Sequence, residues 1–427
     1  MSAKLSRLLP TGRLLEEAIL SKRTTIEQWL RSQWQSISPP FYTSLDLRNS
    51  GAKLAPVDAN LFPGGFNNLG ADAIPLAVQA ADAVIVHYCP TAKRMLLIPE
   101  SHTRNIFYLQ NVASLVDIFT KAGLEVRVGT LIKEITEPYR IDLPDDRSVL
   151  LEPLQRKGNR LGLKDDFDPC LIVLNNDLSG GVPDILKGLE QPVVPPLHAG
   201  WFFRRKTHFF AAYDEVIADF SKLINVDPWL LNTFHAFCGE VDFRTRQGED
   251  CLASQVAFLL EQICEKYREY DITDTPYVVI KANAGTYGMG VMAVKSPEEA
   301  VNLNRKERNK MAKVKEGLEV HEVVLQEGIP TVELVQESVA EPVVYLIDRF
   351  VVGGFYRVHT EKGPDENLNA PGMHFVPEAF ETACVMPEPY EDPHILPNRF
   401  YAYGVVGRLA ALAAAVELKE YVPAGQL

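Results

Sequence analysis

The stretch that decides the fold is residues 277–295, YVVIKANAGTYGMGVMAVK. β-Branched residues run into Lys281, three glycines follow within ten positions, and an apolar run resumes at Val291. This pattern predicts a strand, a glycine-rich turn and a second strand. Glycine lets the backbone approach a phosphate closely, and Lys281 adds a cation beside the loop. We interpret the stretch as a hairpin over the phosphates of a nucleotide, contacted by Lys281, Asn283, Gly285, Gly288 and Gly290.

Three other interpretations of this hairpin are a dinucleotide-binding loop, a P-loop and a plain surface hairpin. Residues 288–293 fit the loose G-x-G-x-x-A form of a dinucleotide fingerprint, but that loop opens a helix, whereas a strand-like run follows here. A P-loop is excluded because G-x-x-x-x-G-K-[ST] occurs nowhere in the chain. On this motif alone, a glycine-rich surface hairpin without a ligand remains an alternative interpretation.

Length and charge narrow the class of protein. A chain of 427 residues exceeds one ordinary core, which predicts two or three packed lobes. Its 46% hydrophobic and 23% charged content is typical of a soluble globular enzyme. A formal charge of −13 argues against nucleic acid or an acidic membrane as the main partner. An anionic ligand therefore needs a local cluster of arginine and lysine.

The cysteines and the N-terminal residues predict a cytoplasmic protein. Six cysteines occur without a C-x-x-C pair, mostly in apolar surroundings, which predicts reduced, buried thiols rather than disulfides or zinc. The first ten residues lack the apolar core of a signal peptide. The apolar stretch 71–89 contains acidic residues, so it is not expected to span a membrane.

The order of patterns predicts an α/β protein in two regions. Residues 1–190 are expected to form an α/β region with a metal-binding strand and a substrate lobe, and 191–427 the nucleotide region. We expect helices at 12–36, from about 72, at 111–121 and at 399–421, and strands at 42–47, 54–59, 94–99, 124–128 and 170–175. The basic stretch 304–315 is interpreted as a helix with a solvated face, with phosphate binding as the alternative.

Two segments after the hairpin suit a nucleotide and a carboxylate. The run 323–330, VVLQEGIP, is a strand ending at Gln326 and Glu327, whose backbone suits an adenine edge with Ile329 beside the ring; a plain polar strand end is the alternative. Arg357 ends the next strand and precedes a polar loop with Asn367 and Asn369. Guanidinium binds carboxylates bidentately, although a surface salt bridge is the simpler interpretation of a lone arginine.

A metal site is predicted near the N-terminus. Asp58 and Asn60 lie two apart on one strand, so their side chains point to the same face. A carboxylate and an amide oxygen suit Mg²⁺, which takes few protein ligands beside nucleotide phosphates. The alternative is a strand end whose side chains make turn hydrogen bonds.

These pieces, in this order, resemble the ATP-grasp ligases, specifically the circularly permuted kind seen in eukaryotic-type glutathione synthetase. The whole sequence looks most similar to the proteobacterial glutamate–cysteine ligases of this type. The resemblance implies metal ligands at Asp58 and Asn60, although Asp stands where that family usually has Glu. The loop's metal-binding Glu of that family is replaced here by Gly285 or Thr286. It further implies substrate contacts from Arg48, Asn105 in Arg-Asn-Ile-Phe, Arg357, Asn367 and Asn369, and ATP contacts from Lys281 and Lys206.

The resemblance implies ligation of the γ-carboxylate of glutamate to cysteine, with ATP and Mg²⁺, through an acyl phosphate. Arg48, Arg357 and Lys281 are the candidate catalytic groups. Glutathione synthetase or another carboxylate–amine ligase of this fold is the alternative. A nucleotide-binding regulator without activity and a dinucleotide oxidoreductase are less favoured. Expected partners are small molecules, neither nucleic acid nor membrane, and a homodimer stays open.

Overall fold

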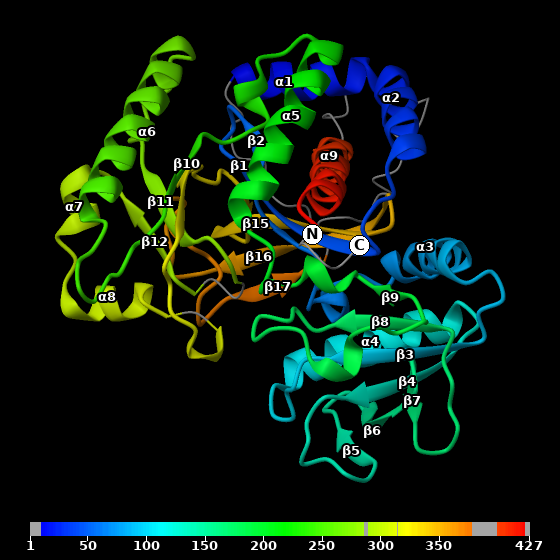
Figure 1. Ribbon diagram of the computed structural model, residues 1–427. Coiled ribbons are helices and arrows are strands. Elements are labelled where there is room, and N and C mark those ends of the chain that lie inside the picture. Colours follow the sequence, from blue (N-terminus) through cyan, green and yellow to red (C-terminus); the bar gives the residue numbers. More distant parts are fainter. Residues whose placement is uncertain (1–9, 286–288, 314, 378–398, 423–427) are drawn as a thin grey trace.

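Three sheets and nine described helices make up the computed structural model, which describes residues 10–285, 289–313, 315–377 and 399–422. Figure 1 shows a parallel-sheet lobe (cyan to green) below, and two antiparallel sheets with their helices above and to the left. The predicted α/β class is confirmed. The helices are α1 (Pro10–Ser21), α2 (Arg23–Ser36), α3 (Ala73–Tyr88), α4 (Ile106–Lys121), α5 (Lys206–Ile224), α6 (Glu249–Glu269), α7 (Pro297–Val301), α8 (Arg305–Met311) and α9 (Arg399–Glu420).

The first antiparallel sheet joins the two ends of the chain. Its order is β17-β16-β15-β1-β2, and β14 pairs with β15. Its strands are β1 (Tyr42–Asn49), β2 (Leu54–Asn60), β14 (Leu334–Val335), β15 (Ser338–Ile347), β16 (Phe350–His359) and β17 (His374–Val376). The predicted boundary between two regions at residue 190 stays a prediction. Strands β1 and β2, before that boundary, share a sheet with strands β14 to β17, after it.

The second antiparallel sheet carries the glycine hairpin. Its order is β10-β13-β11-β12. The predicted strand–turn–strand is confirmed, because β11 and β12 pair antiparallel and the Ala282 amide donates to the Gly290 carbonyl at 2.9 Å. Gly285 and Gly290 have φ values of 105° and 61°, the left-handed region that favours glycine. The strands are β10 (His235–Cys238), β11 (Val278–Ala282), β12 (Val291–Val294) and β13 (Val323–Glu327).

The third sheet is parallel at its centre. Buried apolar runs form β3 and β8, as expected of strands covered on both faces. Its order is β5-β6-β4-β3-β8-β9, with β7 on β6. The strands are β3 (Arg94–Pro99), β4 (Glu125–Thr130), β5 (Tyr139–Asp142), β6 (Ser148–Lys157), β7 (Arg160–Leu163), β8 (Leu171–Asn175) and β9 (Val193–Val194).

The C-terminal helix α9 is the centre of the largest core. It packs against α5, β2 and β15, and its residues Tyr401 to Ala415 are buried almost without interruption. By length and composition alone, residues 400–420 are apolar enough to cross a membrane, but 89% of that window is buried inside the protein. A buried ion pair between Arg204 and Glu417, at 2.9 Å, fixes its last turns.

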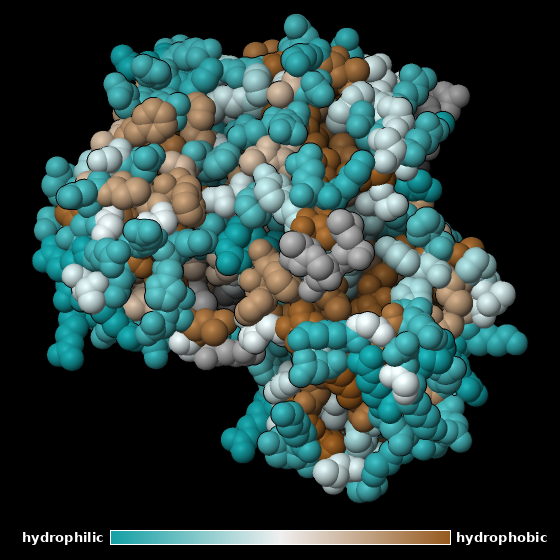
Figure 2. All heavy atoms as spheres, viewed as in Figure 1, coloured by the Kyte–Doolittle hydropathy of each residue, from teal (hydrophilic) through white to brown (hydrophobic). Residues whose placement is uncertain are grey.

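Hydrophilic side chains cover most of the face shown in Figure 2, and apolar atoms gather near its middle.

Three helix predictions were wrong in extent. The helix expected at 111–121 begins earlier, at Ile106. The expected helix 12–36 is two helices that meet at Lys22, where φ is −101° and ψ is 9°. The apolar spacing persists because Ile19 of α1 and Ile26 of α2 enter the same core. The basic helix expected at 304–315 ends at Met311, because the chain then turns toward the parallel-sheet lobe. There Lys315 is buried against Glu100 and Asp177, at 2.8 and 2.9 Å, instead of lying on a solvated face.

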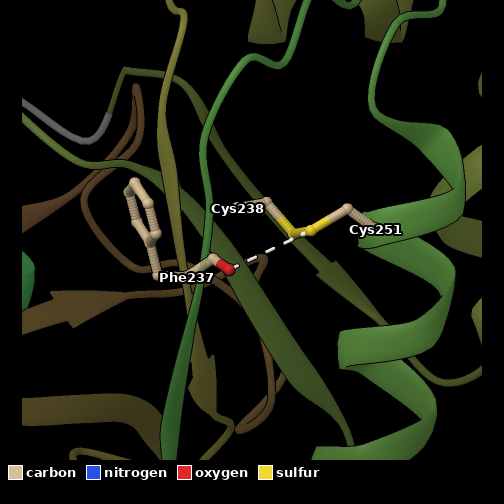
Figure 3. The surroundings of a disulfide bond; sticks show 3 residues. All are labelled: Phe237, Cys238 and Cys251. Atoms are coloured by element: carbon tan, nitrogen blue, oxygen red, sulfur yellow. Dashed lines mark hydrogen bonds between the residues drawn. A yellow bond between two sulfur atoms is a disulfide. The ribbon is translucent and has the colours of Figure 1, made fainter.

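The expectation of reduced thiols was wrong for one pair of cysteines. Cys238 ends β10, Cys251 lies in the first turn of α6, and the fold brings their Cα atoms to 6.1 Å (Figure 3). That separation lies in the range that a disulfide bridges, and the two sulfur atoms are bonded. No local sequence pattern marks this pair, because the contact arises from the packing of α6 on the sheet. Cys89, Cys170 and Cys264 are free, but Cys264 is exposed and the other two are half-buried, so the expectation of buried thiols was wrong for them.

Candidate active site

A cavity of about 920 Å³ lies between the two antiparallel sheets. Strands β11 and β13 form one wall, strands β1, β2, β15 and β16 form the other, and the loop 362–371 contributes a third side. Most predicted site residues meet here, although they come from segments far apart in the sequence. Those that line the cavity are Arg48, Asp58, Lys206, Lys281, Gly285, Gln326, Glu327, Ile329, Arg357, Asn367 and Asn369.

Several predicted residues lie outside the lining of this cavity. Asn60 closes a turn, accepting from the Phe62 amide at 2.9 Å. Asn105 caps α4 and accepts from the Tyr108 amide at 3.2 Å. Asn283 is buried beneath the hairpin, where its side chain accepts from the Thr207 amide at 3.1 Å. Gly290 closes the hairpin, and Gly288 lies outside the described residues.

Lys281 links the two walls of the cavity. Its Nζ donates to the Val57 carbonyl on β2 at 2.8 Å and to Gln326 Oε1 on β13 at 2.7 Å. Gln326 is itself held, since its Nε2 donates to Thr233 Oγ1 at 3.0 Å. Burial lowers the pKa of Lys281 to about 8, while Asp58 opposes this change. The side chain is therefore a fixed cation whose charge depends on pH near neutrality.

Asp58 and Lys206 form a second charged contact in the cavity. Lys206 begins α5, and its Nζ lies 2.5 Å from Asp58 Oδ1. Burial alone would raise the pKa of Asp58, but Lys206 and Lys281 outweigh it and hold that pKa below its ordinary value. The carboxylate is therefore ionised at neutral pH. Across the β1–β2 pair, Asp58 stands opposite Asp46.

The two predicted arginines share one buried acid. Arg48 Nε lies 2.6 Å from Glu341 Oε2, and Arg357 Nη1 lies 2.5 Å from Glu341 Oε1. Arg357 also holds Asp46 through both of its terminal nitrogens, at 2.9 and 3.1 Å. Burial raises the pKa of Asp46 against the effect of Arg357, whereas Arg48 and Arg357 outweigh burial and lower the pKa of Glu341. Charges of both signs therefore alternate on this wall.

Arg48 also anchors the loop that covers the cavity. Its Nη1 and Nη2 donate to the carbonyls of Pro364 and Glu366, each at 2.8 Å. On the opposite side, Lys295 at the end of β12 pairs with Asp365 at 2.8 Å. The loop is thus attached to both sheets, and Asn367 and Asn369 lie on it facing the cavity.

The strand end at β13 presents different environments on its two faces. Gln326 faces Lys281, but Glu327 is buried against Lys53 at 2.9 Å and accepts from Trp229 Nε1 at 3.1 Å. The Glu327 side chain therefore serves the link between β13 and the β1–β2 turn. Burial lowers the pKa of Lys53 to about 8 against the opposing effect of Glu327.

Asp46 and Glu341 were missed from the sequence. Asp46 could have been found, because it lies two residues before Arg48 on one strand and so shares its face. Glu341 had no such signal, since it stands alone in the apolar strand β15 and acquires its role from pairing opposite Arg357.

The donor set fits Mg²⁺ only with help from a ligand. Asp58 offers an ionised carboxylate in the cavity, and Asp46 lies beside it. Among the residues that the structure describes, no group of three or more His, Cys, Asp and Glu side chains could hold a metal by itself. Magnesium commonly takes one or two carboxylates and completes its shell with phosphates and water, which agrees with this cavity.

Comparisons with known proteins identify the family. The glutamate–cysteine ligase family, GshA, matches residues 16–418. The crystal structure of a candidate gamma-glutamylcysteine synthetase from Methylobacillus flagellatus KT is 56% identical, with a TM-score of 0.90, over 98% of this chain and 100% of that one. No curated protein matches.

Two remote structures were also found. A D-alanyl-alanine synthetase A from Vibrio cholerae O1 has 11% identity and a TM-score of 0.35, over 75% of this chain and 81% of that one. A glutathione synthetase-like effector from Globodera pallida has the same identity and TM-score, over 86% and 79%. Both TM-scores are too low to indicate a shared fold.

The fold, the charged cavity and the family match define an α/β enzyme of the ligase class. The chain belongs to the glutamate–cysteine ligase family. The resemblance stated from the sequence is thereby confirmed, as is γ-glutamylcysteine formation as its activity.

Proposed function

We propose that the cavity between the two antiparallel sheets binds ATP, Mg²⁺, glutamate and cysteine, in an ATP-grasp arrangement. The observation that carries this proposal is the meeting of Lys281, Lys206 and the glycine hairpin with Asp58 in one cavity. Membership of a family of ATP-dependent ligases supports the use of ATP. The volume of about 920 Å³ lies in the range of about 300–1,000 Å³ that is common for small-molecule pockets, which agrees with a nucleotide-sized ligand.

The proposed reaction has two steps. The γ-carboxylate of glutamate attacks the γ-phosphorus of ATP, ADP leaves, and an acyl phosphate forms. The amine of cysteine then attacks that carbonyl carbon, phosphate leaves with the C–O bonding pair, and the amine loses a proton. Both steps depend chiefly on positioning and on stabilising charge at the transferring phosphoryl group.

Each part of the cavity has a proposed role in these steps. Lys281 and Lys206 stabilise phosphate charge, and Asp58 would hold Mg²⁺. Asn60, at the end of the same strand, would join it only by releasing its turn contact with the Phe62 amide. When bound, Mg²⁺ supplies charge neutralisation on the phosphate oxygens. The hairpin with Gly285, Gly288 and Gly290, predicted from the sequence to lie over the phosphates, would exclude water, while Asn283 holds its base through the Thr207 amide. The backbone of Gln326 and Glu327 and the side chain of Ile329 would border the adenine base. Arg48, Asn105, Arg357, Asn367 and Asn369 belong to the amino-acid end.

The cellular setting is also part of the proposal. We assign the enzyme to the cytoplasm. Its net charge of −13 supports small molecules rather than nucleic acid or an acidic membrane as its partners. A homodimer is the assembly to test, by light scattering of the purified protein.

The activity is tested by coupled ADP release. The purified enzyme with ATP and Mg²⁺ is expected to release ADP at the full rate only when glutamate and cysteine are both present, because the acyl phosphate needs an amine to turn over. Chromatography should identify γ-glutamylcysteine as the product. Equal turnover with γ-glutamylcysteine and glycine would instead identify a glutathione synthetase.

A pH profile tests the role of Lys281. Its pKa of about 8 means that the charge is present below that pH and is lost above it. The kcat/KM for ATP, which reports the free enzyme, should therefore fall above about pH 8, by up to about tenfold per pH unit. In Lys281→Arg the guanidinium stays charged, so this fall should disappear.

Lys53→Arg is the matched control for that profile, because Lys53 also has a pKa near 8 but is bound to Glu327 on the other face of β13. It should keep the fall of the wild-type enzyme. A fall that persists in Lys281→Arg would exclude Lys281 as its cause.

A further inference from the structure

Asp46 is a cavity acid to which the reaction above gives no role. It lies on β1, and its two oxygens accept from Arg357 Nη1 and Nη2 at 2.9 and 3.1 Å. About 22% of its side chain is exposed, whereas its neighbour Glu341 is only 4% exposed and is held between Arg48 and Arg357. A carboxylate accepts about four hydrogen bonds, so Asp46 keeps acceptor capacity toward the cavity.

Arg357 also has unused hydrogen-bonding capacity. Its Nε is a buried donor without a hydrogen-bond partner among the described residues, and such donors are rare in native proteins. In Arg48, by contrast, each of the three guanidinium nitrogens contacts Glu341 or a loop carbonyl. Arg357 Nη2 carries two N–H groups and makes one hydrogen bond among the described residues, to Asp46 Oδ1 at 3.1 Å, so Arg357, which lines the cavity, keeps a donor for a ligand.

A paired acid and arginine suit a ligand that carries both charges. A site for a simple anion would present a guanidinium without a neutralising carboxylate beside it. Here the Arg357–Asp46 pair offers a donor next to an acceptor, which matches the carboxylate and ammonium on the α-carbon of an amino acid.

The chemistry of the ligation indicates which of the two amino acids binds at the Arg357–Asp46 pair. The amine of cysteine is the nucleophile, so it must become neutral and reach the acyl carbon. Glutamate reacts through its γ-carboxylate and keeps both α groups. Its α-amine can also react: when neutral, it can attack the carbonyl carbon of its own γ-acyl phosphate, forming an N–C bond. Phosphate then leaves with the C–O bonding pair and the nitrogen loses a proton, which gives a five-membered lactam.

We infer that Asp46 binds the α-ammonium of glutamate, beside Arg357 for its α-carboxylate, and so prevents this cyclisation. The inference rests on the proposed function. A carboxylate in contact with the ammonium stabilises its protonated form, which has no lone pair for attack. It also holds the nitrogen away from the carbonyl carbon of the γ-acyl phosphate. Asp46 thus binds the ammonium and also prevents the cyclisation.

Calorimetry with three ligands tests the binding half. Glutamate, glutarate (no ammonium) and 4-aminobutyrate (no α-carboxylate) are titrated into the enzyme with Mg²⁺ and a non-hydrolysable ATP analogue. The wild-type enzyme should bind glutamate about tenfold or more tightly than either analogue. Asp46→Asn should lose the preference over glutarate and keep that over 4-aminobutyrate. Arg357→Lys should show the opposite pattern.

Glu341→Gln is the matched control, since it removes the other carboxylate on Arg357. It should weaken glutamate and glutarate by similar factors and leave their ratio unchanged. Melting temperatures of all variants establish that each is folded. If Asp46→Asn keeps the wild-type ratio but changes the Mg²⁺ dependence, Asp46 is a metal group beside Asp58 and the inference is overturned.

Product analysis tests the second half. With ATP and glutamate but no cysteine, Asp46→Asn should release several-fold more lactam per ADP than the wild-type enzyme, as measured by mass spectrometry. An unchanged lactam ratio would overturn the guarding role. The proposed function fails separately, and only if the wild-type enzyme does not ligate glutamate to cysteine.

Discussion

Replacing Lys281 by alanine is expected to lower kcat/KM for ATP by roughly tenfold or more, because a charge-assisted contact contributes on the order of 1.5–3 kcal/mol. The side chain lies between the Val57 carbonyl and Gln326, so its ammonium is placed by both walls of the cavity before any ligand arrives. Such preorganised charge is most effective at the transferring phosphoryl group, where negative charge is redistributed. Steady-state kinetics with ATP varied at saturating amino acids gives the value.

The same substitution should perturb Asp58. Lys281 is one of the cations that hold the pKa of Asp58 below its ordinary value, so its removal should raise that pKa. Lys222→Ala is the control, since Lys222 is an exposed lysine of α5 that pairs with nearby Asp219. It should behave as the wild-type enzyme. Unchanged ATP kinetics in a folded Lys281→Ala enzyme would remove Lys281 from the nucleotide site.

The parts of the site that the sequence predicted are those determined by near neighbours. The hairpin of β11 and β12 follows from β-branched runs on either side of glycines, and its turn requires the positive φ of Gly285 and Gly290. The period of two predicted that Asp58 and Asn60 share a face; Asp58 lines the cavity, whereas Asn60 accepts from the Phe62 amide at the strand end. Both features are local, so a single sequence suffices.

What the sequence could not predict depends on distant register. Asp46 and Arg357 are 311 positions apart, and they meet only because β15 pairs with β1 on one side and β16 on the other. Lys315 likewise became buried because the parallel-sheet lobe presents Glu100 and Asp177 to it. Local patterns indicate that a residue is charged and exposed on its own element, but not which acid another segment brings.

Asp58→Asn is expected to lower kcat by about 100-fold or more while leaving the fold intact. The substitution keeps the shape of Asp58 and removes its charge, which faces Lys206 at 2.5 Å and lies near Lys281. Without that carboxylate the two lysines repel each other, and the proposed Mg²⁺ site loses its ionised ligand. Loss of one preorganised electrostatic group commonly costs about 10²–10³ in kcat.

Turnover at several Mg²⁺ concentrations distinguishes the two causes, because a lost ligand raises the Mg²⁺ requirement whereas misplaced lysines raise the KM for ATP. Asp227→Asn is the matched control: it breaks an Asp–Lys contact of 2.6 Å to Lys266, at a position that does not line the cavity. It should retain wild-type turnover. Asp58→Glu should recover part of the activity, since it restores the charge on a longer side chain. If Asp58→Asn shows the turnover and Mg²⁺ dependence of the wild-type enzyme, Asp58 serves only to position Lys206, and the metal must be held by other groups.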